Sequence, residues 1–375
     1  VMKFMSGERT VLENFLPGLD KKLLDIPLME LEKPKSQGIT LYREAGGAGL
    51  MIPKLYKGKG ASAIDMVKIT RAIASRSPSL AIANTMHQFS LGSLISMAEN
   101  SNGLEWMLLE GIASERRLMA SAFAEGLSSQ SILAPTMKAV WNGNNWRVSG
   151  KKQPCTLAHS MDLLTASVSL EHPDKTIKTG VALIPAESKG IRIEPFWSSF
   201  ALSGAESETV ILEDVEVHPD LVFELDTSLN GILDDLQTIG FIWFELLLTA
   251  SYLGVATALV ERVLESKRGS ASERTNICIL LENAALALYA TAKDITDGQG
   301  NNDNLAQSLI VRYATAKSIR EAVNHAVELL GGMAFIRSSN IAYLTACAHA
   351  IAFHPPSQQS AVEALDGWFN GNPLI

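Results

Sequence analysis

The stretch "ELLGGMAFIRSSNIAYLTACAHAIAFHPPSQQ", residues 328–359, joins a helical pattern to two kinds of helix breaker. An apolar helical repeat runs into it as far as Leu330, and the glycine pair Gly331-Gly332 ends that helix. Farther along, His354 is followed by two prolines, which lack a backbone N–H and stiffen an irregular loop. The stretch therefore predicts the end of a long helix followed by loops.

Helical patterns also fill the rest of the C-terminal part of the chain. Long helices are predicted over residues 229–266, 272–296 and 304–330, and a shorter one is expected after Pro356. The third of these has one apolar face, made by Leu309, Tyr313, Ala316, Ile319, Val323, Val327 and Leu330. Long helices with short connections predict an antiparallel four-helix bundle over residues 226–375.

The remaining two parts of the chain differ from each other in pattern. Residues 1–117 have helical apolar spacing, with Pro78 beginning a new helix. Residues 118–225 contain short strands at roughly ten-residue intervals, with a hairpin signal at Asn142-Gly143. These strands predict a small β-barrel or sandwich. The fold class is therefore mainly α, with an N-terminal helical domain, a middle β-barrel domain and a C-terminal four-helix bundle.

Composition excludes several classes of protein. The 375 residues are 47% hydrophobic and 19% charged, which is typical of a globular protein. A net charge of −8 without a basic stripe argues against a nucleic-acid partner. The three cysteines have neither paired nor metal-ligand spacing, and the first residues lack the zones of a secretory signal peptide. We therefore expect a cytoplasmic protein with no metal site.

The segment Thr238–Val260 needs a separate test, because it is apolar except for Glu245 and long enough to span a bilayer. A charge in its first third, together with Thr249, Ser251 and Tyr252, also suits a helix that is buried on all sides. We predict a buried helix and no membrane partner.

Four separate stretches matter for their order and spacing along the chain: "ASAFAEGLSS" at 120–129, "SGKKQPCTLAHSMDLL" at 149–164, "ESETVILEDVEVHPDLV" at 206–222 and "ELLGGMAF" at 328–335. In order and separation they resemble the acyl-CoA dehydrogenase superfamily over nearly the whole chain. The resemblance implies FAD bound between the β-domain and the bundle, and removal of two hydrogens from an acyl thioester. It also implies a homo-oligomer, a dimer or tetramer, with an electron-accepting partner possible.

The resemblance assigns cofactor contacts to particular residues. The expected FAD-binding residues are Phe123, Ala124, Ser129, Cys155, Thr156, Glu328, Gly331, Gly332, Ser357 and Gln359. Chemically, a threonine hydroxyl can bond the edge of a flavin ring, and glycines allow close approach of backbone to a ligand. The alternatives are an ordinary strand threonine at Thr156 and a simple helix stop at Gly331-Gly332.

The chain departs from the family pattern at several of these places. Ala124 stands for the family threonine, Pro154 for its tryptophan, and "SKRGS" at 266–270 for its Arg-x-Phe-Gly motif. Aligned without gaps from the glycine pair, the family's catalytic carboxylate falls on Pro355. Proline has neither a proton-accepting side chain nor the N–H that helps polarise the thioester carbonyl. The pocket is expected to be kept, but without the usual base.

Two residues could replace that base. Glu245 lies one residue after the position, Phe244, from which a minority of the family takes its base, and burial would raise its pKa. The alternative is that Glu245 pairs with a buried arginine. His354 adjoins the lost carboxylate and could take a proton near neutral pH, or it could serve only to cap the proline-stiffened loop.

Three functions follow from these residues. The first, which the resemblance favours, is an FAD-dependent oxidoreductase that dehydrogenates an acyl thioester or related substrate at its α and β carbons with an atypical base. The second is a flavin-dependent monooxygenase or oxidase of the same fold, for which a missing carboxylate matters less. The third is a non-catalytic oligomeric paralogue.

Overall fold

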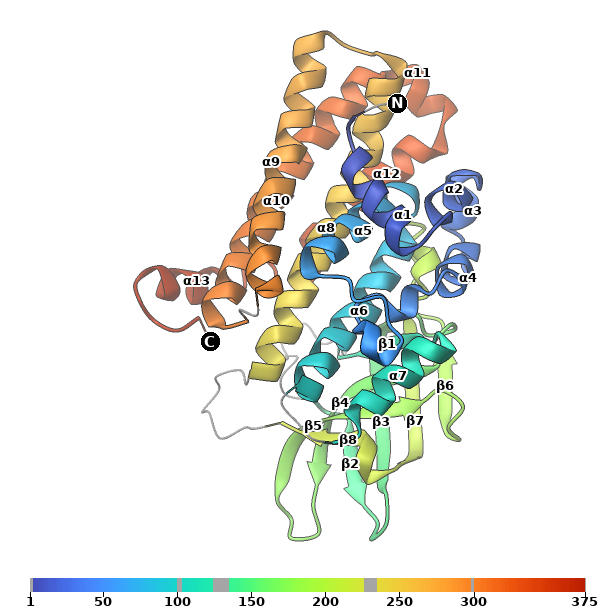
Figure 1. Ribbon diagram of the computed structural model, residues 1–375, viewed down its shortest axis with the longest axis vertical. Coiled ribbons are helices and arrows are strands. Elements are labelled where there is room, and N and C mark those ends of the chain that lie inside the picture. Colours follow the sequence, from blue (N-terminus) through green and yellow to red (C-terminus); the bar gives the residue numbers. More distant parts are fainter. Residues whose placement is uncertain (1–2, 100–102, 124–134, 226–234, 298–299, 375) are drawn as a thin grey trace.

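The computed structural model describes residues 3–99, 103–123, 135–225, 235–297 and 300–374. Helices come first, then a sheet, then long helices again, as the sequence predicts. The sheet lies at one end of the molecule, and the long helices α8, α9 and α10 extend away from it (Figure 1).

The N-terminal part consists of helices and short 3-10 turns. They are α1 (Ser6–Phe15), α2 (Leu19–Leu24), α3 (Leu28–Leu31), α4 (Gln37–Glu44), η1 (Gly47–Gly49), η2 (Lys54–Tyr56), α5 (Ala63–Arg76), α6 (Pro78–Glu99) and α7 (Glu105–Glu115). Helix α5 begins with a capping box, in which the Ser62 hydroxyl and the Asp65 carboxylate each bond the other residue's N–H. Pro78 begins α6, which confirms the prediction for that residue.

The middle part is one mixed sheet in the order β6-β7-β3-β2-β4-β5-β8, with β1 paired to β4. Its strands are β1 (Met119–Ala122), β2 (Lys138–Trp141), β3 (Trp146–Cys155), β4 (Leu163–Glu171), β5 (Ile177–Pro185), β6 (Ile191–Glu194), β7 (Glu208–Val217) and β8 (Val222–Glu224). The Asn142 side chain accepts the N–H groups of Asn144 and Asn145, which forms the predicted hairpin between β2 and β3. A bridge between Ser121 and Thr156 brings β1 back to the end of β3 and curls the sheet towards a barrel.

The C-terminal part is built on α8 (Asp235–Ser266), α9 (Ala271–Thr296) and α10 (Asn302–Leu330). Their bounds agree with the predicted helices to within two residues wherever the structure describes both. The shorter elements are α11 (Gly332–Arg337), α12 (Ser339–His349), η5 (Ala350–Phe353) and α13 (Val362–Phe369). A helix does follow Pro356, but α12 rather than α13 packs against α8 and α10 as the fourth helix of the bundle.

Helix α8 is the central helix of the whole molecule. It contacts α5 and α6 from the N-terminal part as well as α9, α10 and α12. By length and composition, Gln237–Ser266 and Ala271–Thr296 could each cross a membrane, but 83% of the apolar window of the first is buried inside the protein. The prediction of a buried helix over residues 238–260 is confirmed.

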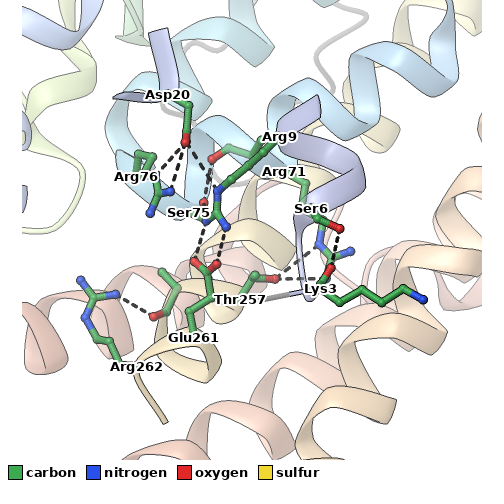
Figure 2. Close-up of polar contacts among 12 residues, drawn as sticks. Lys3, Ser6, Arg9, Asp20, Arg71, Ser75, Arg76, Thr257, Glu261 and Arg262 are labelled. Carbon is green, nitrogen blue, oxygen red and sulfur yellow. Dashed lines mark hydrogen bonds and ion pairs between the residues drawn. The ribbon is translucent and has the colours of Figure 1, made fainter. Parts of the chain in front are cut away.

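A polar network fastens the N-terminal helices to α8 (Figure 2). Arg9 forms an ion pair with Glu261, and Asp20 accepts hydrogen bonds from Arg76. Arg71, whose side chain is fully buried, donates to Glu8 at 2.7 Å and to Glu282 at 2.7 Å. Because a buried guanidinium needs paired acceptors, these contacts fix α1, α5 and α9 against one another.

Candidate functional site

Three aromatic side chains meet where α6, β1 and α8 approach one another. The ring of Phe89 lies 6.0 Å from that of Phe123 and 5.5 Å from that of Phe244, measured between centroids. All three side chains are only half-buried. An apolar surface of this kind suits the flat ring of a cofactor or the alkyl part of a substrate.

Two hydroxyl groups pair just beyond the ends of neighbouring strands, after β3 and before β7. The Thr156 hydroxyl lies 2.9 Å from that of Ser207, and both side chains are buried. The Cys155 thiol donates weakly to the carbonyl of Ser121 at 3.6 Å, and burial raises the pKa of that thiol to about 12. Cys155 therefore stays a neutral packing residue, whereas Thr156 and Ser207 offer hydrogen bonds.

Glu245 is held in a buried ion pair. Both of its carboxylate oxygens lie 2.9 Å from Nη1 of Arg312, and the two side chains are 1% and 2% exposed. Burial raises the pKa of the Glu245 carboxyl, and the positive charge of Arg312 partly offsets that rise. Of the two alternatives for Glu245, the structure shows the pairing with a buried arginine.

The same arginine reaches the proline-containing loop. Nη2 of Arg312 donates to the carbonyl of His354 at 2.5 Å, and Nη1 lies 3.4 Å from the carbonyl of Pro355. The next residue of α10, Tyr313, donates its hydroxyl to the carbonyls of Pro356 at 2.9 Å and Ser357 at 3.3 Å. Two adjacent side chains therefore hold four consecutive carbonyls of the loop.

His354 is fixed through its ring as well as its carbonyl. Its Nδ1 lies 3.1 Å from the hydroxyl of the fully buried Tyr252 and 3.4 Å from the carbonyl of Ala350. Burial and the charge of Arg312 lower the pKa of His354 to about 4. The pKa of the Tyr252 hydroxyl is raised by burial, so it keeps its proton and can donate it to Nδ1. His354 is then neutral: Nδ1 accepts from Tyr252 when the ring proton is on Nε2, and donates to the Ala350 carbonyl when the proton is on Nδ1.

The two predicted catalytic residues are thereby brought into one cluster, since both contact Arg312. Glu245 and Tyr252 are seven residues apart on α8, which is two helical turns, so they share one face. Phe244 lies about 100° around the helix and faces the aromatic cluster instead. Helix α8 thus connects the loop with the apolar surface near the sheet.

Other predicted residues lie elsewhere. Gly331 follows α10, roughly 27 Å along that helix from Tyr313, with Glu328 exposed one turn before it. A Cβ on Gly331 or Gly332 would meet open space. The Ser357 hydroxyl bonds Ser360 at 3.1 Å, and Gln359 is exposed. Ala124 and Ser129 lie outside the described residues.

Comparison with known proteins identifies the family. No protein-family model matches the chain. Isobutylamine N-hydroxylase of Streptomyces viridifaciens is 42% identical over 378 residues, which cover 100% of both chains. Acyl-CoA dehydrogenase YdbM of Bacillus subtilis is 25% identical over 228 residues, 60% of this chain and 56% of that protein. The chain belongs to the acyl-CoA dehydrogenase-like flavoprotein superfamily.

A solved structure of this superfamily has the same fold. The complex of TdsC from Paenibacillus sp. A11-2 with FMN and indole superposes with a TM-score of 0.83 at 18% identity, covering 97% of this chain and 96% of that one. At that identity the likeness concerns the fold alone. The resemblance stated from the sequence is confirmed, and with it the order of helical, β and helical parts.

Sequence analysis did not identify five residues of the site: Phe89, Ser207, Tyr252, Arg312 and, in its polar role, Tyr313. Arg312 could have been found, because it interrupts the apolar run "SLIVRYATA" at 308–316, and a charge in such a run needs a partner. Glu245, a carboxylate within another apolar run, is the partner of opposite charge that such an arginine needs.

Proposed function

We propose that the protein is a flavin-dependent monooxygenase that N-hydroxylates a small aliphatic primary amine. The reaction is RNH2 + O2 + reduced flavin → RNHOH + H2O + oxidised flavin, which uses dioxygen as oxidant and needs a reductase to supply the reduced flavin. The 42% identical relative carries this activity in its name and matches over its whole length. This relative supports our choice of monooxygenation over the acyl dehydrogenation that the sequence favoured.

Neither Pro355 nor Glu245, the two residues at which a base would stand, offers a free carboxylate, and this observation supports the proposal most directly. Pro355 has no proton-accepting group, and the Glu245 carboxylate is bonded to Arg312 through both oxygens. Removal of an α-proton from a thioester requires a free base, whereas transfer of oxygen to an amine requires only its lone pair. The site therefore suits the second chemistry better.

The residues present fit a flavin. Phe89, Phe123 and Phe244 give a half-exposed apolar surface for a ring, and the hydroxyls of Thr156 and Ser207 give hydrogen-bonding groups at its edge. When bound, a reduced flavin would activate dioxygen, so that one of the two atoms of dioxygen is transferred to the amine. We infer that the form used is FAD, held weakly because Pro154 and the "SKRGS" segment replace family contacts.

The apolar surface also acts on the substrate. A free alkylamine has a pKa close to that of lysine, about 10.4, so it is protonated in water and has no lone pair to react. Burial in an apolar pocket disfavours the charged form and lowers that pKa. Neutral His354, held by Tyr252, could then donate from Nε2 to an oxygen atom without competing for the amine proton.

The test is oxygen uptake by the purified protein with NADH, a flavin reductase and either FAD or FMN, with and without isobutylamine. The proposal expects amine-dependent uptake that requires the reductase and produces a hydroxylamine. Flavin bleached anaerobically by an acyl-CoA, with no uptake in response to any amine, would refute it. The same oxygen-uptake assay, run with FAD and with FMN, shows which flavin the protein uses.

We also infer a homo-oligomer, because α11 presents an apolar surface made of Met333, Phe335 and Ile336, all exposed. Exposed apolar patches of this kind mark contact surfaces. Light scattering at micromolar concentration tests this inference, and a stable monomer would contradict it.

A further inference from the structure

The loop at residues 354–357 depends on side chains for its hydrogen bonds. Pro355 and Pro356 have no N–H, so the loop cannot be held by donors of its own at these positions. Its carbonyls are taken by Arg312 and Tyr313, adjacent residues of α10. Because both side chains belong to α10, the position of the loop is fixed by the helical bundle and not by residues next to the loop in sequence.

Arg312 can bind the loop because its other side is also fixed. Nη1 faces the Glu245 carboxylate, while Nη2 faces the carbonyl of His354. The planar guanidinium cannot turn without breaking one of these contacts. The Cζ atom of Arg312 also lies 5.7 Å from the ring centroid of Tyr313, so the two side chains pack beside each other. The Glu245–Arg312 pair thus gives His354 a defined backbone position, and Tyr252 gives it a defined ring position.

We propose that Arg312, held by Glu245, is the positioning residue for His354 in the oxygen-transfer reaction. The inference rests on the proposed N-hydroxylation. Arg312 acts through the loop, and its role is to keep the imidazole where it can donate to oxygen near the amine. Glu245 is then a support for Arg312 and has no proton-transfer role.

The consequence is a specific defect when Arg312 is changed. With a reduced flavin and dioxygen, the protein would form hydroxylamine, water and oxidised flavin when amine is correctly placed, and only oxidised flavin and H2O2 when it is not. A displacement of about 1 Å of a reacting group can cost roughly 100-fold in rate. A misplaced His354 should therefore lower hydroxylamine formed per dioxygen consumed by roughly 10- to 100-fold, while dioxygen consumption continues.

The experiment compares Arg312→Lys and Arg312→Ala with the matched control Arg71→Lys. Arg71 is an equally buried arginine with two carboxylate partners, and it bonds no residue of the loop. A single lysine ammonium cannot serve Glu245 and the His354 carbonyl at the separate positions of Nη1 and Nη2. Both Arg312 variants should lose coupling, which is the ratio of hydroxylamine formed to dioxygen consumed. The ratio is measured for the folded fraction of each enzyme. Arg71→Lys should lower thermal stability and keep the wild-type ratio.

A second readout does not depend on the reaction. With histidines labelled at Cε1, NMR should show no titration of His354 between pH 5.5 and 8 in the wild type, because its pKa is about 4. In Arg312→Ala, the same signal should titrate at a higher pKa, because the ring loses the nearby positive charge and the loop that buries the ring loses its anchor. Unchanged coupling and unchanged titration in Arg312→Ala would overturn the inference. A changed titration in a protein that hydroxylates no amine would instead refute the proposed function alone.

Discussion

Replacement of Glu245 by glutamine separates a supporting carboxylate from a catalytic one. The substitution keeps the shape of the side chain and removes its charge. Arg312 would then remain 2% exposed with an uncompensated charge, still bonded to the carbonyl of His354. Breaking a buried pair by removing one partner costs about 3–5 kcal/mol. Because the amide oxygen still accepts one hydrogen bond, we expect a loss near the lower end, about 3 kcal/mol.

The assay is urea unfolding followed by circular dichroism, with turnover measured at a temperature where the variant is folded. Glu282→Gln is the matched control: Glu282 pairs with the buried Arg71, but its side chain is 45% exposed, so its loss should cost under about 1 kcal/mol. The double variant Glu245→Leu/Arg312→Met removes both charges and should recover much of the loss in stability. It should not recover coupling, since the loop contact is still absent.

The opposite pattern would identify Glu245 as a catalytic carboxylate. If Glu245→Gln lost under about 1 kcal/mol of stability and abolished turnover, the carboxylate would be a free catalytic base. The buried pair with Arg312 would then not describe the working state of the site.

Three other predictions follow from the loop and the surface. Pro355→Glu restores a carboxylate and an N–H, so anaerobic bleaching of bound flavin by a straight-chain acyl-CoA should become at least about 100-fold faster, and an unchanged rate would count against the family alignment at this loop. His354 has its pKa lowered to about 4, so the unfolded chain binds more protons than the folded one between about pH 4 and 6.5; stability should fall as pH falls through that window, and His354→Gln should flatten the pH dependence measured by urea unfolding. Ile336→Asp on α11, at a residue 76% exposed, should dissociate the oligomer in light scattering, whereas Leu55→Asp, at a residue 82% exposed on η2, should not.

Features decided by neighbouring residues could be predicted from the sequence. The hairpin at Asn142-Gly143 follows from local turn chemistry, and α8, α9 and α10 follow from apolar spacing and the glycines that end them. Helix α12 was not predicted, because its apolar residues are buried on most sides and leave no clear polar face. Its Tyr343 hydroxyl bonds the carboxylate of Glu32, the residue just after α3, 311 residues away.

The candidate site was predicted in part. Glu245 was singled out as the one carboxylate in an apolar run, and His354 as a residue beside the missing base. Their connection could not be predicted, because Arg312 is 67 residues from Glu245 and 42 from His354, and only the packing of α8 against α10 brings them together. The roles of Gly331 and Gly332 as cofactor contacts stay a prediction.

The most direct test of the central claim is mass spectrometry of the amine product formed under dioxygen labelled with the heavy oxygen isotope. The reaction would contain the protein, flavin, NADH, a flavin reductase and isobutylamine. We predict an N-hydroxylated amine that carries one labelled oxygen atom and forms only when protein, reductase and dioxygen are all present. Absence of that product, or a hydroxylamine whose oxygen comes from water, would contradict a flavin-dependent monooxygenase.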